Sequence, residues 1–189
     1  GFLLYRRLPR LLPALIITCL AFAALSVAHH ASAGGKTTRV IPDDGGLARQ
    51  IVHYRKQTWR WQNLMGARRT PATHKALHAP SRKYKRWVRN LWKRRAIRAR
   101  LKAHNPPHEA GWLCIQRHEG PWKDPNAPYY GGLQMDIGFQ RTYGTRLLRT
   151  KGTADNWTPV EQMWVAEKAH RSGRGYYPWP NSARYCGLI

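Results

Sequence analysis

The sequence predicts a mostly helical protein of the α+β class, in which a cationic helical segment precedes a small, nearly neutral domain. Apolar residues recur at helical spacing along much of the chain. The charge is divided unevenly, because residues 49–102 contain eighteen Lys or Arg and no acidic residue, whereas residues 109–189 contain ten basic and seven acidic residues. The helix-breaking stretch His104-Asn105-Pro106-Pro107 separates the two parts and marks the domain boundary.

The overall composition limits the class of protein. A chain of 189 residues has room for one ordinary domain with an appended segment, which excludes a large multidomain machine. Hydrophobic residues make up 42% and aromatic residues 11%, so the chain can bury a core. A formal charge of +24 favours a polyanionic partner, which can be nucleic acid, an anionic membrane surface or an acidic polymer.

The first 33 residues have the plan of a secretory signal peptide. Three arginines between residues 6 and 10 precede an apolar run over residues 11–28, and the small triplet Ala31-Ser32-Ala33 follows. We expect cleavage after Ala33 and a secreted or cell-wall-associated protein. The alternative is an uncleaved membrane anchor, because eighteen apolar or small residues could just span a bilayer.

Cleavage would leave two cysteines, Cys114 and Cys186, in an oxidising compartment. We expect them to pair, and closing a loop of this length would stabilise the fold by roughly 4 kcal/mol in the chain-entropy model. The alternatives are two free thiols or part of a metal site. The scattered histidines show no spacing that would complete such a site, so we expect no metal and no organic cofactor.

The cationic segment, residues 34–107, is predicted to contain two amphipathic helices. The apolar positions are Leu47, Ile51, Tyr54, Trp61 and Met65 in the first, and Tyr84, Trp87, Val88, Leu91 and Trp92 in the second. Residues 66–71 and 78–81 between them are typical of turns or a flexible linker. The segment could anchor the protein to an anionic polymer, dock on the second segment, bind nucleic acid or a membrane surface, or act as a solvated spacer.

One carboxylate in the second segment has the setting of a general acid. Trp112, Ile115 and Glu119 follow helical spacing, and Gly120-Pro121 must end that helix. Glu119 would therefore face the negative end of the helix dipole, and Trp122 could desolvate it; both effects favour the protonated acid that glycosidic cleavage requires. The net positive charge opposes them, and an ordinary solvated Glu at a helix end is the alternative.

Three short motifs surround this position in order: Glu119-Gly120-Pro121-Trp122, then Tyr129-Tyr130-Gly131-Gly132-Leu133-Gln134-Met135, then Pro178-Trp179-Pro180-Asn181. Over residues 111–188 the sequence resembles the transglycosylase-like domain of the actinobacterial resuscitation-promoting factors, which are small relatives of lysozyme and the lytic transglycosylases. The resemblance implies a small lysozyme-like domain with a minor β element over residues 108–189.

The resemblance also implies roles for individual residues. Glu119 corresponds to the catalytic glutamate, Gln134 to a residue lining the sugar cleft, and Trp179 to the Trp before the second cysteine. Cys114 and Cys186 correspond to the family's disulfide. The sequence departs from the family in one place, since His118 stands where the family has its first cysteine and Cys114 lies one helical turn earlier.

A polysaccharide cleft needs flat apolar surfaces and a few polar groups. Trp122, Tyr129, Tyr130 and Trp179 could supply the surfaces and Gln134 a polar partner, although we expect about half of these aromatic residues to be core instead. Gly131-Gly132 would let the backbone approach the substrate.

The remainder of the second segment is predicted to be scaffold. Thr158 to Glu161 have capping-box spacing, and a helix with an inward face at Met163, Val165, Ala166 and Ala169 is expected to end at Gly173. Of the other carboxylates, Asp155 is assigned to a turn and Glu167 to this helix.

These observations predict a secreted peptidoglycan lytic transglycosylase or muramidase that cleaves the β-1,4 bond between N-acetylmuramic acid and N-acetylglucosamine with Glu119 as the single general acid. Asp124 and Asp136 are the nearest further acids, and neither lies in a recognisable second-acid motif. The expected partners are glycan strands, together with anionic wall polymers or a membrane surface through residues 49–102. The alternatives are a catalytically weak wall-binding or signalling module and a cationic nucleic-acid or membrane-binding protein, with nucleic acid the least expected partner of a secreted chain.

Overall fold

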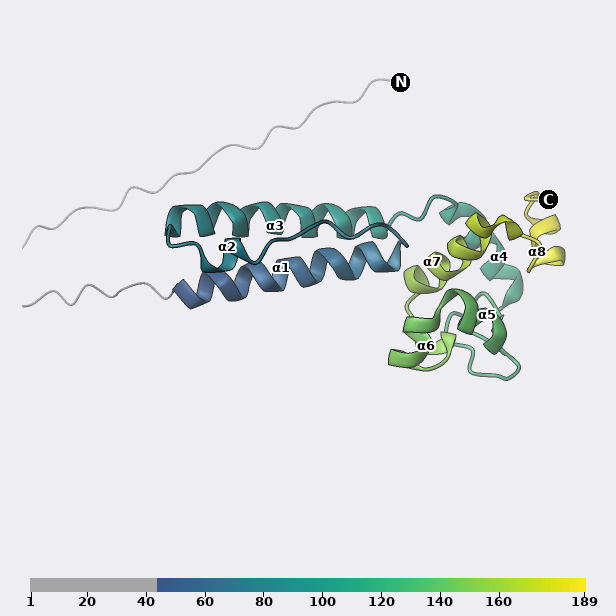
Figure 1. The fold of residues 1–189 in the computed structure, drawn as a ribbon. Coiled ribbons are helices and arrows are strands. Elements are labelled where there is room, and N and C mark those ends of the chain that lie inside the picture. Colours follow the sequence, from purple (N-terminus) through teal and green to yellow (C-terminus); the bar gives the residue numbers. More distant parts are fainter. Residues whose placement is uncertain (1–43) are drawn as a thin grey trace, which may run out of the picture. The chain divides into compact units, whose positions relative to one another are not determined.

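A computed structural model describes residues 44–189, so the predicted signal peptide and its cleavage site after Ala33 lie outside the described residues. The described chain is mostly helical with one small two-stranded sheet (Figure 1). The prediction of a mostly helical α+β protein is therefore confirmed.

The described elements lie within one compact unit, with a break between Ala103 and Glu109. The cationic part contains α1 (Asp44–Leu64), α2 (Lys75–His78) and α3 (Arg82–Ala103). The C-terminal domain contains α4 (Glu109–Glu119), β1 (Tyr129–Tyr130), β2 (Met135–Asp136), α5 (Ile137–Tyr143), α6 (Thr145–Lys151), α7 (Pro159–Ala169) and α8 (Pro180–Tyr185), with short helical turns η1 (Ala154–Asn156) and η2 (His170–Arg174).

The two predicted amphipathic helices form a parallel pair, α1 and α3, which we call the helical pair (Figure 1). Ile51 of α1 packs with Val88 and Trp92 of α3 in a core that also includes Ala76. A parallel pair needs a long return connection, and residues 65–81 supply it.

Side chains of α1 hold this return segment in place. The Trp59 indole donates to the carbonyl of Thr70 at 2.8 Å, and the Arg55 guanidinium donates to the carbonyl of Thr73 at 3.2 Å. Gln62 also exchanges two hydrogen bonds with Thr70. The segment predicted to be turns or flexible linker is therefore bound along α1, because its backbone carbonyls find donors there.

Aromatic rings contact two arginines of the helical pair. Arg55 is 6% exposed, and its guanidinium lies 5.8 Å from the ring of Trp59 and 5.5 Å from that of Trp92. The Arg95 guanidinium lies 4.9 Å from the centre of the Trp92 ring. Cation–π contacts of this kind stabilise arginine side chains that pack against aromatic rings.

The ends of α1 and α3 contact α7 through one tryptophan. Trp164 is buried against Met65 and Ala103, and its indole donates to the Ala103 carbonyl at 2.6 Å. Arg171 adds a hydrogen bond to the Met65 carbonyl at 3.2 Å. The cationic part is therefore packed on the C-terminal domain at this point.

The domain core surrounds α7. The four residues predicted to face inward, Met163, Val165, Ala166 and Ala169, are all buried, in a cluster with Trp112, Ile115, Leu133, Met135, Phe139, Trp157 and Trp179. The capping box of Thr158 and Glu161 is present as predicted. The helix ends at Ala169 and continues into η2, in which Gly173 adopts a φ of +93°, a left-handed conformation that glycine accepts readily.

Glu161 makes fold stability depend on pH. Burial alone would raise the pKa of Glu161, but the Lys151 ammonium at 2.7 Å and hydrogen bonds from Thr158 outweigh it and hold the pKa below its ordinary value. A lowered pKa contributes stability that is present above the unfolded-state pKa, near 4.3, and is lost as pH falls through the folded value. We expect Glu161→Gln to lower the melting temperature at pH 7 and to lose this effect progressively as the pH falls below about 4.3. Thermal unfolding of both proteins across this range checks the prediction, and a difference independent of pH would contradict it.

The expected disulfide is present. Cys114 of α4 is bonded to Cys186, directly after α8, with 6.0 Å between the two Cα atoms. The pairing of these cysteines is confirmed, and free thiols are excluded. The bond ties the first helix of the domain to its last.

Candidate active site

Glu119 is the last residue of α4, as predicted from Gly120-Pro121. Its carboxylate is half-buried and accepts a hydrogen bond from the Ser182 hydroxyl, with 2.5 Å between the two oxygen atoms. Ser182 belongs to α8 and is itself buried. A contact between residues 63 positions apart thus fixes the carboxylate at the end of its helix.

Ser182 was not predicted to take part in the site. Its hydroxyl also lies 3.4 Å from the carbonyl of Trp179, three residues earlier. Pro180 at the first turn of α8 starts the helix that places Ser182 on the same side as Trp179. The only sequence signal for it is this spacing from a motif residue, and such spacing is common in helices.

Gln134 lies beside the end of α4. It follows a tight turn between β1 and β2 and has a φ of +44°. Its amide nitrogen donates to the Asp124 carboxylate at 2.9 Å and to the Gly131 carbonyl at 3.0 Å. A Cβ atom on Gly120 would meet this nitrogen at 3.2 Å, so the residue after Glu119 touches Gln134. Within residues 44–189 the Gln134 amide oxygen accepts no hydrogen bond, which leaves it as an acceptor for a ligand.

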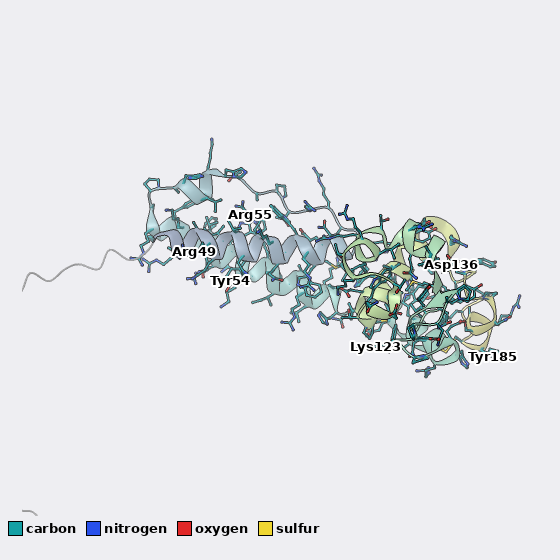
Figure 2. The ribbon with its side chains drawn as sticks, turned by 90° about the horizontal axis from the view of Figure 1, so that it is seen from below. Arg49, Tyr54, Arg55, Lys123, Asp136 and Tyr185 are labelled. Carbon is teal, nitrogen blue, oxygen red and sulfur yellow. A yellow bond between two sulfur atoms is a disulfide. The ribbon has the colours of Figure 1, made fainter. Side chains whose placement is uncertain are left out.

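Asp124 and Asp136, the two acids nearest to Glu119 in the sequence, accept hydrogen bonds from other parts of the protein. The hydrogen bond from the Asn126 backbone and that from the Gln134 amide lower the pKa of Asp124. The Asp124 carboxylate therefore stays ionised and fixes the orientation of the Gln134 amide. Asp136 caps α5 by accepting from the Phe139 backbone at 2.7 Å. Figure 2 labels Asp136 within the C-terminal domain, apart from Arg49, Tyr54 and Arg55 on α1.

A groove of about 380 Å³ runs past these residues. Its lining includes Tyr129, Gln134, Asp136, Arg174, Pro178 and Trp179. Glu119 is not among the lining residues. It is linked to the groove by Gly120, which touches Gln134, and by Ser182, which follows Trp179.

The four candidate aromatic residues divide between groove and core. Tyr129 is 50% exposed and lines the groove. Trp179 lines it too, but is only 4% exposed, because its indole donates to the Leu133 carbonyl at 2.6 Å and its ring packs against Trp112. Trp122 and Tyr130 pack on the core. The structure thus brings Tyr129, Gln134 and Trp179 together, and it places Trp122 and Tyr130 in a supporting position.

Packing within the protein requires Gly131 and Gly132, a role that the sequence did not predict. A Cβ atom on Gly131 would lie 2.5 Å from the Gln162 side chain, and one on Gly132 would lie 2.8 Å from the Trp122 ring. These glycines make room for protein side chains. The buried Gln162, which sequence analysis did not single out, donates to the carbonyl of Trp122 at 2.8 Å and holds this turn against α7.

Glu167 and Asp155, the two other carboxylates weighed against Glu119 as functional groups, both have structural roles. Glu167 is completely buried and accepts from the His108 backbone at 3.0 Å and from the Trp112 indole at 2.8 Å. It therefore ties the start of α4 to α7 out of reach of a substrate. Asp155 lies in η1, a short turn, as assigned from the sequence.

One group of possible metal ligands lies near the disulfide. Among residues 44–189, Cys114, His118 and Cys186 bring their ligand atoms within 4.8 Å of one another. The two sulfur atoms are bonded to each other, so neither is a thiolate that could hold a metal. His118 instead stacks on Tyr185, with ring centroids 5.4 Å apart.

Comparison with known proteins finds no matching family model, no matching curated protein and no matching solved structure. No helix within residues 44–189 has the length and apolar character needed to cross a bilayer. The proposed function therefore depends on the geometry of the site and on the sequence motifs.

Proposed function

We propose that this protein is a secreted glycosidase with a lysozyme-like domain that cleaves the β-1,4 bond between N-acetylmuramic acid and N-acetylglucosamine in peptidoglycan. Glu119 is its general acid. The observation that carries the proposal is the Glu119 carboxylate, which is held by Ser182 at the end of α4, while Gly120 directly after it adjoins Gln134, a residue that lines the groove. Both its position at the end of α4 and its place in the first motif therefore support Glu119 as the general acid.

Ser182 suits a carboxyl group that gives up and regains a proton. When Glu119 is ionised, the Ser182 hydroxyl donates to it. When Glu119 carries the proton, Ser182 can accept from it and turn its own hydrogen toward the Trp179 carbonyl. The side chain therefore keeps one orientation in both protonation states, which a general acid needs before and after it protonates the leaving oxygen.

The groove has features that suit a sugar chain. Its volume of about 380 Å³ lies at the lower end of the range for small-molecule sites, roughly 300–1,000 Å³, so it holds one or two sugar residues. Tyr129 offers an exposed ring for a sugar face, and the amide oxygen of Gln134 can accept from a hydroxyl or acetamido N–H.

The positions of the other acids favour a mechanism with one carboxyl group. Asp124 is committed to Asn126 and Gln134, and one oxygen of Asp136 is committed to the α5 backbone. A hydrolase usually needs a second carboxylate to act as a nucleophile or to activate water, whereas a lytic transglycosylase can let the muramyl substituent close an anhydro ring. The second route needs nothing beyond Glu119. Asp136 is the candidate second acid if the product is hydrated.

Clearing of purified peptidoglycan suspensions tests this function, and the Gln134→Leu variant tests the groove. Loss of the free amide oxygen of Gln134 in the groove is expected to raise KM by about tenfold, the equivalent of one hydrogen bond of roughly 1.4 kcal/mol, with a smaller effect on kcat. Gln57→Leu on α1 is the matched control and should clear the suspension at the wild-type rate. An unchanged KM in Gln134→Leu would place the substrate elsewhere.

We further propose that the helical pair holds the enzyme at an anionic membrane surface. Tyr84 and Trp87 stack on each other in solvent, 44% and 55% exposed, although their spacing was predicted to place them on the apolar face of the helix. Ile97 and Leu101, one turn apart further along α3, are 49% and 61% exposed among arginines and lysines. Exposed aliphatic and aromatic groups within a basic surface suit a lipid interface, whereas a purely polar wall polymer would leave them unused.

Vesicle binding tests this surface. We expect vesicles containing phosphatidylglycerol to bind the protein and uncharged phosphatidylcholine vesicles to bind it weakly, with loss of affinity as salt increases. The Trp87→Ser/Leu101→Ser double variant should bind at least tenfold more weakly, whereas Asn90→Ser on the same helix should not. Equal binding by wild type and the double variant would assign the contact to charge alone.

A further inference from the structure

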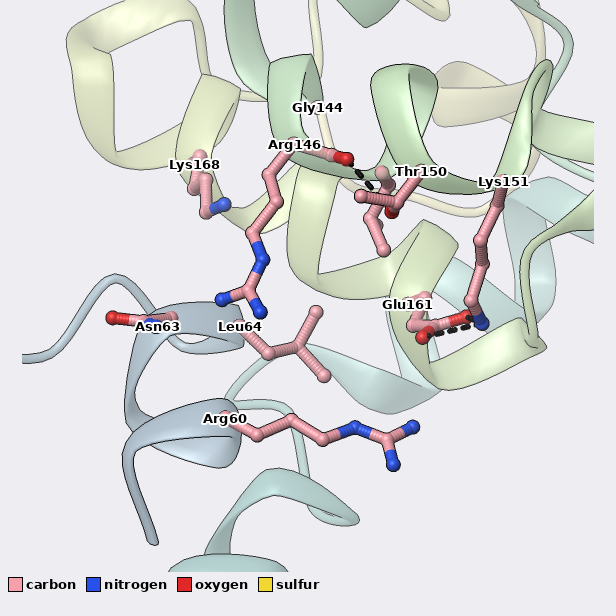
Figure 3. A pocket seen from close by; sticks show the side chains of 10 residues that line it. Arg60, Asn63, Leu64, Gly144, Arg146, Thr150, Lys151, Glu161 and Lys168 are labelled. Carbon is pink, nitrogen blue, oxygen red and sulfur yellow. Dashed lines mark hydrogen bonds and ion pairs between the residues drawn. The ribbon is translucent and has the colours of Figure 1, made fainter. Parts of the chain in front are cut away.

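A second pocket lies where the end of α1 meets α6 and α7, away from the candidate active site. It has a volume of about 190 Å³, and its lining includes Arg60, Leu64, Arg146, Leu147, Glu161 and Lys168 (Figure 3). The groove beside Glu119 shares none of these residues. The pocket is therefore separate from the groove.

The pocket has an excess of positive charge. Its one carboxylate, Glu161, is already neutralised by Lys151, whose ammonium lies 2.7 and 2.8 Å from its two oxygen atoms (Figure 3). Arg60, Arg146 and Lys168 form no ion pair with any acidic residue in the described part of the chain. Three cations thus border one small space without a counterion.

The ammonium group of Lys168 is destabilised by its burial and by neighbouring positive charges. Burial, together with the charges of Arg146 and Arg171, lowers the pKa of the Lys168 ammonium. Its single protein acceptor is the Tyr143 carbonyl at the long distance of 3.4 Å. The packing of α6 against α7 and η2 brings these like charges together, and an anion in the pocket would offset their repulsion.

Size and chemistry indicate the kind of anion. A pocket of about 190 Å³ is smaller than the roughly 300 Å³ at which sites for drug-sized ligands begin, so it suits a single charged group and excludes a sugar chain. A guanidinium group can donate two parallel N–H hydrogen bonds to two oxygen atoms of one phosphate, and a lysine ammonium adds a positive charge. Leu64 and Leu147 provide an apolar wall for the carbon atoms attached to such a group.

We propose that this pocket binds a phosphate group, either as free phosphate or as the phosphate of a glycerophosphate-type ester. Arg60 belongs to α1, Arg146 to α6 and Lys168 to α7, so one phosphate would contact both the helical pair and the C-terminal domain. Binding should consequently strengthen the junction at Trp164. The proposal rests on the cations of this pocket and not on the enzymatic activity.

Titration of the protein from Gly34 onward, at constant ionic strength maintained with chloride, tests the proposal. The probes are inorganic phosphate, glycerol 3-phosphate and phosphatidylglycerol vesicles, with isothermal calorimetry and melting temperature as readouts. We expect saturable binding of at least one phosphate probe and a rise in melting temperature. Tighter binding of glycerol 3-phosphate than of inorganic phosphate would identify an ester as the ligand. If neither soluble probe binds, vesicle binding that Arg146→Gln weakens would identify a lipid headgroup in the pocket.

Two variants and one control separate the pocket from the general basic surface. Arg146→Gln and Lys168→Met should each weaken phosphate binding at least tenfold. Arg149→Gln removes an exposed charge from the same helix outside the pocket and should leave it unchanged. Arg146 is exposed, so its variant is expected to fold even if Lys168→Met does not. Absence of saturable binding to both soluble phosphates, with vesicle binding that Arg146→Gln leaves unchanged, would overturn the proposal, and so would equal weakening in Arg149→Gln.

Discussion

The Glu119→Gln variant is expected to release muropeptides from peptidoglycan on the order of 10²- to 10⁴-fold more slowly than the wild type, which is the usual contribution of general acid catalysis. Glutamine keeps the shape of the side chain and can still accept from Ser182, but it has no acidic proton to give to the glycosidic oxygen. The melting temperature should change little, because the site is half-buried and lies outside the core cluster. Chromatography of soluble products over time measures the rate.

Glu109→Gln at the opposite end of α4 is the matched control for this variant. It removes the same charge from the same helix, and we expect the wild-type rate. If Glu119→Gln released products as fast as the wild type, Glu119 would lose its catalytic assignment, and a wall-binding or signalling role for the groove would become the better explanation.

Loss of the disulfide should have the largest effect on stability. For a bond between cysteines separated by 72 positions, the chain-entropy model gives about 4 kcal/mol, so the Cys114→Ser/Cys186→Ser variant should unfold with that much less free energy. For a folded unit of the size of residues 44–189 the melting temperature should fall by roughly 8–16 °C. Activity should fall too, because α8 carries Ser182 and the bond fixes its end to α4.

Calorimetry with and without reductant checks this second prediction. The wild type in reductant should melt near the temperature of the double variant, and the double variant should not respond to reductant. A wild-type melting temperature that is the same in both conditions would show that the bond contributes little to the folded state under these conditions.

Local sequence signals predicted much of the fold. The end of α4 at Glu119 follows from a glycine and a proline, and the start of α7 follows from Thr158 and Glu161. The pairing of Cys114 with Cys186 follows from the number of cysteines after the predicted cleavage site. Each of these features depends on residues close in sequence or on a choice with few alternatives.

Features that depend on distant residues could not be predicted in this way. Helical periodicity defines an apolar face but not the direction of its neighbour, so the parallel pairing of α1 with α3 was not foreseen. Ser182 is recognisable only once α8 has been placed against α4. Asp124 gains its role from Gln134, ten residues later in an irregular loop.

Aromatic residues were the least predictable part of the site. Trp87 and Trp92 both lie on α3 among basic residues, yet Trp92 is buried against Arg55 and Trp87 is exposed. Trp122 and Tyr129 belong to neighbouring motifs, yet the first supports the glycine turn and the second lines the groove. Residue type alone does not distinguish these roles, because a ring that suits a sugar face also suits a core.

Mass spectrometry of the products from purified peptidoglycan tests the central claim most directly, with Glu119→Gln digests as the blank. We predict soluble glycan fragments that end in muramic acid, either as the anhydro form of a lytic transglycosylase or as the form heavier by one water molecule of a muramidase. Peptidoglycan that yields no such fragments with the wild-type protein, under conditions in which the protein is folded and bound to the wall, would contradict the proposed function.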